Sequence, residues 1–194
     1  VAVVSLDNMQ VLYAGIENPI TVSVPGVDGR NIKASIIEGN GKLAPGEGEG
    51  KYNLTPANGC KKIVIGVDAV VDKKTSRMGA PVFKVKEIPA PTITVGGFTN
   101  GAKVSRSSLA SGTTVIARPQ EGFEFKIPKG SIRVMSLEVF VGNKPFNMNG
   151  NTFDPDLLSA IKKANRGDKI YVDAKVMMPD GVPRTSSCIL TISK

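Results

Sequence analysis

Two prolines separated by a single residue divide the chain nearly in half. Pro89 and Pro91 lie within residues 86–92, Lys-Glu-Ile-Pro-Ala-Pro-Thr. Each proline fixes its own φ and pushes the residue before it toward an extended backbone. A strand cannot continue through such a segment, which instead favours a semi-rigid, polyproline-like spacer. We therefore expect two domains, residues 1–88 and 89–194, although a proline-rich loop inside a single domain is the alternative.

The length of the chain permits this division. With 194 residues, each half is long enough to bury a core without disulfide or metal support. No apolar run approaches the length of a membrane span, and no N-terminal signal pattern is visible. The first residue is Val1, so we expect a processed protein or a fragment, and a membrane anchor upstream is left open.

The positive charge of the chain is concentrated in the second half. The net charge is +8, and residues 1–88 carry 11 basic and 9 acidic side chains, against 14 and 8 in residues 89–194. A basic surface attracts nucleic acids, anionic membranes or acidic proteins. Aromatic residues make up only 5% of the chain, and no basic and aromatic module for RNA or DNA is present. The composition therefore favours an acidic or anionic partner other than nucleic acid.

The chain contains no histidine and two cysteines. The missing histidine removes the commonest general base and the commonest metal ligand, and no set of residues converges on a reaction class. We therefore expect no enzyme, no catalytic residues, no metal and no cofactor. Cys60 and Cys188 lie on opposite sides of the proline segment, and both are predicted to be buried thiols that act as small hydrophobic residues.

Short alternating segments separated by turn residues fill the first half. Residues 20–24 and 32–36 alternate apolar and polar side chains with period two, which indicates half-buried strands. Residues 60–71 form the richest β-branched run, in which Gly66 is a candidate bulge. About seven short strands, with turn signals between them, predict an immunoglobulin-like β-sandwich that lacks the Cys-Trp-Cys hallmark of antibody domains.

The second half combines strands with one main helix. Asp154 is a candidate N-cap, Pro155 fits the first helical position, and Gly167 is a candidate left-handed residue at the C-terminus. These signals predict a helix over about residues 154–166. Strands are predicted at residues 92–95, 114–117, 131–141, 168–176 and 187–192, and one or two helical turns at 103–111. The second half is thus predicted to be a β-rich α+β domain, mostly antiparallel sheet with the helix packed on it.

Two irregularities are predicted in the second half. The alternation slips at Met135-Ser136, which indicates a bulge. Residues 143–150 are polar and are predicted to form a loop, yet they carry Phe146 and Met148. These two side chains either pack into the core, which their usual burial favours, or are offered to a partner. With Lys144, they are the candidate partner-binding residues of the chain.

Three further patterns have ordinary structural interpretations. The glycine-rich residues 46–50 resemble a phosphate loop, but two glutamates and a following strand favour a hairpin loop. Asp154 and Asp156 resemble the start of a calcium loop that does not continue, so a helix cap is expected. The serines near Lys103 lack a glycine elbow or an oxyanion loop, so a polar helical turn is expected rather than a nucleophile.

Two long segments resemble a known family. Residues 151–173 read NTFDPDLLSAIKKANRGDKIYVD, a capped helix followed by a strand, and residues 4–26 read VSLDNMQVLYAGIENPITVSVPG. The first segment resembles the C-terminal domain of the GldM/PorM family of type IX secretion and gliding motility. The second resembles that family's third periplasmic domain, and the PorM branch is the most similar. One segment lies in each half, and the two occur in the order found in the family. The resemblance therefore spans both halves and the proline segment between them.

The resemblance implies a non-enzymatic part of a molecular machine. Family members are inner-membrane proteins with an N-terminal transmembrane helix and a long, multidomain, dimeric periplasmic shaft. Their membrane part works with GldL/PorL as a proton-driven motor, and their tip contacts an outer-membrane-associated ring of GldK/PorK and GldN/PorN. The chain would then be the last two periplasmic domains, a homodimeric shaft and docking module without catalytic residues to carry over.

A cell-surface adhesin or a carbohydrate-binding β-sandwich is the alternative function. The immunoglobulin-like pattern of the first half motivates it. Sugar sites generally use stacked aromatic side chains, and the chain has three tyrosines and no tryptophan. The sequence therefore favours a docking module over a sugar-binding one.

Overall fold

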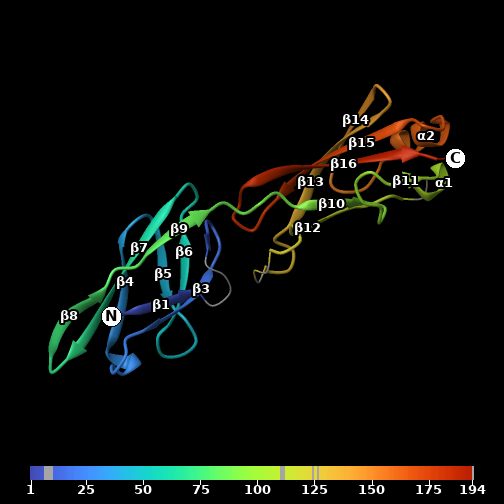
Figure 1. Cartoon of the computed structure of the whole chain (residues 1–194). Helices are drawn as coiled ribbons and strands as arrows, with labels where there is room; N and C mark the ends of the chain where they lie inside the picture. The colour runs from blue at the N-terminus through green and yellow to red at the C-terminus, as the bar shows by residue number, and fades with distance from the viewer. Residues whose placement is uncertain (7–10, 110–111, 124, 126, 194) are drawn as a thin grey trace. The chain divides into compact units, whose positions relative to one another are not determined.

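The computed structural model describes residues 1–6, 11–109, 112–123, 125 and 127–193 (Figure 1). The chain divides into two compact units, Val1–Ile88 and Pro89–Lys194. Strand β9 ends at Lys86 and β10 begins at Thr92, so the proline segment between them carries no regular structure. Among the described residues, no helix is both long enough and apolar enough to cross a membrane.

The first unit is built almost entirely from strands. Its elements are β1 (Val3–Leu6), β2 (Leu12–Tyr13), β3 (Asn18–Ser23), the 3₁₀ turn η1 (Gly29–Asn31), β4 (Ile32–Glu38), β5 (Gly41–Pro45), β6 (Lys51–Pro56), β7 (Lys62–Val71), β8 (Lys74–Gly79) and β9 (Val82–Lys86).

These strands form two sheets that share one core. The first sheet has the order β1-β3-β6-β5, and the second has the order β2-β9-β7-β4 with β8 also paired to β7. The core takes Ile20 and Leu54 from the first sheet and Leu12, Ile63 and Ile65 from the second, all fully buried. Two sheets that face each other across such a core form a β-sandwich. The predicted fold class of the first half is therefore confirmed.

Asn18 is the one buried polar side chain of this core among the described residues of the first unit. Its Oδ1 accepts a hydrogen bond from the Tyr13 N–H at 2.8 Å, and its Nδ2 donates to the carbonyls of Tyr13, Ile16 and Leu54 at 2.9–3.1 Å. These bonds join the turn before β3 to β6. The side chain thereby supplies hydrogen-bond partners to buried and part-buried backbone groups.

The first unit departs from the sequence prediction at two places. Strand β8 was not expected, because Lys-Thr-Ser-Arg-Met-Gly lacks apolar alternation, and it forms by pairing with β7. Gly66 pairs in register with Ser35, and the register shifts lie beside it rather than at it. A Cβ at this glycine would lie 2.8 Å from Ile37 Cγ2 and 2.9 Å from the Arg77 guanidinium, so these side chains would have to shift.

The second unit contains seven further strands and two helices among its described residues. They are β10 (Thr92–Val95), β11 (Lys103–Val104), α1 (Arg106–Leu109), β12 (Val115–Arg118), β13 (Arg133–Val141), β14 (Lys144–Asn149), α2 (Pro155–Lys163), β15 (Lys169–Met177) and β16 (Pro183–Ile192).

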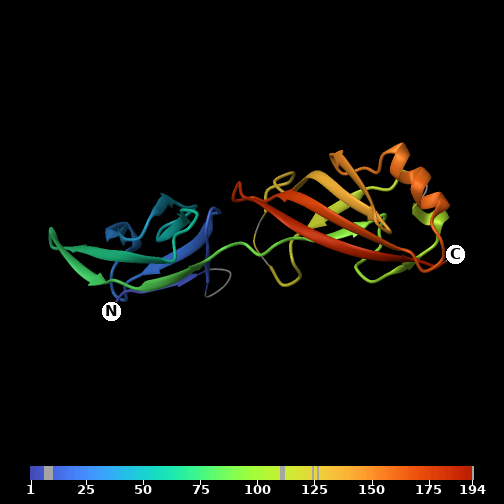
Figure 2. The same ribbon diagram turned by 90° about the horizontal axis from the view of Figure 1, so that it is seen from above.

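A five-stranded sheet of order β11-β16-β15-β13-β14 organises the second unit. One face is buried, including Val139 on β13, Ile170 and Val172 on β15, and Leu190 on β16. The separate β10–β12 ribbon packs against it, with β10 contacting β16 and β12 contacting β13 (Figures 1 and 2). The prediction of a β-rich domain with one main helix is confirmed. The predicted bulge is confirmed as well, because the β13–β15 register shifts between Val134 and Ser136.

Helix α2 begins as predicted and ends earlier than predicted. The Asp154 carboxylate accepts a hydrogen bond from the Leu157 N–H at 2.8 Å, and Pro155 occupies the first turn. The last helical residue is Lys163, and Ala164 is already extended. Arg106 from α1 donates to the Ala164 carbonyl at 3.0 Å and so caps this end. Gly167 has a φ of +92° but serves the following turn, so the predicted end at residue 166 is wrong.

Residues 144–149 form a strand, so the predicted polar loop is wrong. Strand β14 pairs with β13 from Val141↔Lys144 to Ser136↔Asn149. The two are joined by Gly142 and Asn143, and Gly142 has a φ of +60°. A two-residue connection with glycine at its first position matches the twist of antiparallel strands. The pairing with β13 therefore overrides the low strand propensity of the asparagines.

The two cysteines differ in environment, which corrects half of the prediction for them. Both are free thiols. Cys188 is fully buried on β16, and burial raises the pKa of its thiol. Cys60 is only half-buried, and its Sγ lies 3.2 Å from the Lys62 carbonyl oxygen.

Replacing Asn18 tests the buried network of the first unit. We expect Asn18→Ala to lower the free energy of unfolding by about 2–4 kcal/mol, because it removes at once the hydrogen bonds of one buried and several part-buried backbone groups. Urea unfolding of the 194-residue chain measures this. Asn40→Ala, at an exposed turn position, is the matched control and should change little. A loss at Asn18 no larger than the loss at Asn40 would contradict the assigned role.

Thiol labelling tests the burial of the cysteines. We expect Cys60 to react with an aromatic disulfide reagent in the folded chain. Cys188 should react only after unfolding, because the attacking species is the thiolate and burial disfavours it. In Cys60→Ser the fast reaction should vanish. A fast phase that survives this substitution would show that Cys188 is accessible.

Candidate partner-binding surface

The second face of the five-stranded sheet is open to solvent and displays ordered rows of side chains. The register aligns Asn147, Glu138, Asp173 and Ser187 across β14, β13, β15 and β16. In a sheet covered on one side, alternate residues of each strand must face water. We refer to this surface as the outer face.

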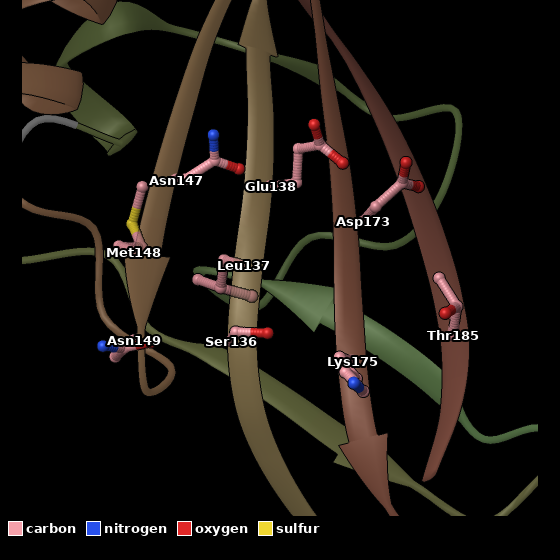
Figure 3. A pocket seen from close by; sticks show the side chains of 9 residues that line it. All are labelled: Ser136, Leu137, Glu138, Asn147, Met148, Asn149, Asp173, Lys175 and Thr185. Atoms are coloured by element: carbon pink, nitrogen blue, oxygen red, sulfur yellow. The ribbon is translucent and has the colours of Figure 1, made fainter.

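A hollow of about 480 Å³ lies in the outer face (Figure 3). Its polar lining includes the Glu138 and Asp173 carboxylates, which occupy directly opposite positions on neighbouring strands, and Lys175 two residues along β15. The Asp173 carboxylate accepts a hydrogen bond from the Ser187 hydroxyl. The hollow thus combines both signs of charge with amide and hydroxyl groups, which suits polar contacts rather than an apolar ligand.

An apolar row borders this polar region. Phe140 on β13 is paired with Tyr171 on β15, and Tyr171 is paired with Ile189 on β16. Phe140 and Ile189 are half-buried, and Tyr171 is 38% exposed. An aromatic side chain on an otherwise polar face offers contact area to a partner. The outer face therefore has the mixed character of a protein interface.

The three predicted partner-binding residues all lie on β14, at the edge of the sheet. Lys144, Phe146 and Met148 are opposite Val141, Val139 and Leu137 in register, so they share the inward side of the strand. Phe146 and Met148 are half-buried. The Lys144 ammonium lies 5.1 Å from the centre of the Phe146 ring, a cation–π contact.

A groove of about 590 Å³ runs between β14 and α2. Lys144, Phe146 and Asn147 line it from the strand, and Asp154, Asp156, Ser159, Ala160 and Lys163 line it from the helix. The structure therefore brings Lys144 and Phe146 together beside α2. Sequence reasoning missed the helix residues of this groove and all of the outer face. The outer face had a usable signal in the alternation of residues 168–176, whereas no local signal links β14 to α2.

The other patterns noted in the sequence have structural roles. The glycine-rich residues 46–50 connect the paired strands β5 and β6, as expected of a hairpin loop. The Ser105 hydroxyl contacts Ser107 and Ser108 at 2.9 and 2.6 Å and accepts from the Ser108 N–H at the start of α1. Ser111 lies outside the described residues. No group of three or more metal-ligating side chains occurs within the described part of the chain.

The groove depends on the cap of α2, which provides a test. We expect Asp154→Ala to lower the stability of the second unit by about 1 kcal/mol, because it removes the acceptor for a helix N–H. Asp156→Ala should cost less, since Asp156 acts only through the helix dipole. Thermal unfolding followed by circular dichroism compares the two. Equal losses would contradict the capping role of Asp154.

Comparison with known families gives matches over both units. The profile of the GldM third domain matches residues 1–86, and that of the GldM C-terminal domain matches residues 89–193. A comparison with curated protein sequences finds no match.

Two of the solved structures that match show distant likeness. The D1-D4 ectodomain fragment of ICAM-5 is 12% identical with a TM-score of 0.36, over 98% of this chain and 46% of that one. The EC3-6 cis-dimer of protocadherin gammaB7 is 9% identical with a TM-score of 0.32, over 99% of this chain and 50% of that one. The chain spans about half the length of these structures, and such likeness carries no argument about its role.

Proposed function

The chain belongs to the GldM family, and on that premise we propose that it is the shaft and docking region of a GldM-type motor protein. The family makes it a component of type IX secretion and gliding motility. In the proposed role, the chain links a proton-driven motor in the inner membrane to a ring of proteins associated with the outer membrane.

The single observation that carries this proposal is the family match, which extends over both units in series. The GldM family is a structural component of the secretion machinery and is not a known enzyme family. Two β-rich units joined by a proline segment suit a shaft, because a short polyproline-like spacer resists bending more than a glycine-rich one.

The expected location and partners follow from the family. GldM proteins are anchored in the inner membrane and extend into the periplasm, so we place this chain in the periplasm. Its proposed partners are a second copy of itself and the ring proteins of the GldK/PorK and GldN/PorN type. A motor partner of the GldL/PorL type would act through a region that precedes this chain.

The carbohydrate-binding alternative has less support. Tyr13 and Tyr52 are half-buried in the first unit, which leaves Tyr171 as the exposed tyrosine. A sugar ring generally stacks on a flat, exposed aromatic surface. One tyrosine at 38% exposure provides little of this, and we retain the docking role.

Sedimentation tests the docking role. We expect the 194-residue chain to sediment as a dimer and to co-sediment with GldK/PorK-type and GldN/PorN-type ring proteins. The variant Lys169→Glu/Lys175→Glu, which reverses two exposed charges of β15, should weaken this association and make it less sensitive to salt. Lys33→Glu/Lys42→Glu makes the same change of charge on the first unit and is the matched control.

Two outcomes of this experiment would contradict the proposal in different ways. A wild-type chain that never co-sediments with either ring protein would refute the docking role. Equal weakening by both double variants would show that only net charge matters and that the second unit does not carry the contact.

A further inference from the structure

The outer edge of β14 presents backbone groups that no described residue satisfies. Because Gly142 and Asn143 form a two-residue turn, Val141 and Lys144 are the closing hydrogen-bonded pair, and such pairs alternate along the ladder. The Gly150 N–H donates to the Met135 carbonyl at 2.8 Å, as expected if every second residue from Lys144 onward is hydrogen-bonded to the neighbouring strand. Pro145, Asn147 and Asn149 therefore direct their backbone groups away from β13.

The residue types in β14 agree with this assignment of outward-directed positions. Pro145 has no N–H and occupies an outward-directed position, where the ladder to β13 needs none. The N–H and C=O groups of Asn147 and Asn149 have no backbone partner within the described part of the chain. Proline thus limits pairing at one end of the edge, and beyond the other end Asn151 and Phe153 pair with Val115 and Thr113. The stretch open to an added strand is therefore that of Asn147 and Asn149.

The opposite edge of the sheet is different. Along β16, the Ile189 N–H is bonded to the Asn100 side chain at 2.8 Å, and the Thr191 and Ser193 N–H groups are bonded to the carbonyls of Ala102 and Val104. Residues 100–104 therefore cover the end of β16 next to β11. No described segment covers β14 in this way.

The groove beside α2 lies where it could receive side chains of a strand added to β14. Alternate side chains of a strand paired to β14 would point to its inward side, where the 590 Å³ groove lies. Half-buried Phe146 and Ala160 offer apolar contact there. Backbone pairing to an edge together with side-chain pockets beside it is an established mode of peptide recognition.

The groove carries two ammonium groups and two carboxylates, and the ammonium groups are the ones left to pair with a charged ligand. Lys144 and Lys163 line it, and neither ammonium forms an ion pair with a described residue. Of its two carboxylates, Asp154 is already bonded to the Leu157 N–H, and Asp156 lies in the first turn of α2, where the helix dipole stabilises it. The surrounding unit carries 14 basic and 8 acidic side chains, so it attracts negative charge.

We propose that β14 and the β14–α2 groove bind an extended acidic peptide segment of a partner protein, which adds to the five-stranded sheet as a further strand. The proposal rests on the docking function proposed above and deepens it by assigning the site and the chemistry of the docked segment. Pairing uses the backbone of Asn147 and Asn149, an apolar side chain lies against Phe146, and carboxylates face Lys144 and Lys163.

A model peptide tests the site without any ring protein. The probe is acetyl-Thr-Glu-Thr-Val-Thr-Glu-Thr-amide, whose alternate residues place Glu, Val and Glu on one side. Titrated into the ¹⁵N-labelled 194-residue chain, it should cause saturable shifts of the Asn147 and Asn149 amide signals. The same peptide with Lys in place of Glu should bind at least about tenfold more weakly, equivalent to about 1.4 kcal/mol.

Two substitutions at one position separate backbone pairing from side-chain contact. Asn147→Pro removes an outward N–H at a position like that of Pro145, and it should reduce affinity for the probe by about tenfold. Asn147→Ala keeps the N–H and should bind within about threefold of the wild type. If Asn147→Pro does not fold, a probe N-methylated on its threonines, which cannot donate in pairing, replaces it and should lose binding to the wild type.

Charge reversal tests the groove. Lys144→Glu/Lys163→Glu should weaken binding of the Glu probe and strengthen binding of the Lys peptide. Signal shifts confined to residues away from β14 and α2, no saturable shifts at all, or equal binding by Asn147→Pro and Asn147→Ala would each overturn the site.

Loss of ring-protein co-sedimentation in Asn147→Pro but not in Asn147→Ala would tie the site to docking. Co-sedimentation that is retained in both variants would show that docking does not use this site. Failure of the wild-type chain to co-sediment would refute the docking function and would leave the peptide site unaffected.

Discussion

Burial of a single face of the five-stranded sheet is the constraint on which the second unit depends. Strand β15 alternates between buried Ile170, Val172 and Ala174 and outward Tyr171 and Asp173. A one-residue slip would exchange the two sets, so apolar burial fixes the register of the whole sheet. The same constraint leaves the other face in water, and the strand order leaves β14 as an edge. The surfaces proposed for docking are thus a consequence of how the core is satisfied.

The sequence predicts those elements whose apolar pattern or capping residues act locally. The alternation of residues 168–176 and the Asp154-Pro155 cap of α2 both produced the expected elements. Strands β8 and β14 could not be predicted in this way, because they are polar and exist through pairing with β7 and β13. The end of α2 at Lys163 was missed for a similar reason. Its capping donor, Arg106, lies 58 residues before Ala164 in the sequence.

The candidate site was predictable only as a set of residues. Phe146 and Met148 stood out because apolar side chains are unusual in a polar segment, and Lys144 is their neighbour. The half-buried state of Phe146 and Met148 follows from the edge position of β14, where the sheet covers one side of a side chain and not the other. The groove also needs Lys163, on a helix that only the tertiary fold brings beside β14. The hollow of the outer face likewise needs the register of four strands.

Strand addition at β14 would suit the proposed role of the chain as a shaft that transmits force. A docked strand is held by backbone hydrogen bonds, whose geometry is the same for every sequence, and the groove then selects which sequence binds. Load on that strand passes to β13 and β15 through continuous ladders rather than through the short helix α1 or the nine-residue helix α2. The strands β13 and β15 carry buried residues such as Val139 and Val172, and buried apolar contacts resist local opening. A contact at this edge would therefore pass load to the buried strands of the sheet, whereas a contact to α2 alone would depend on one helix cap.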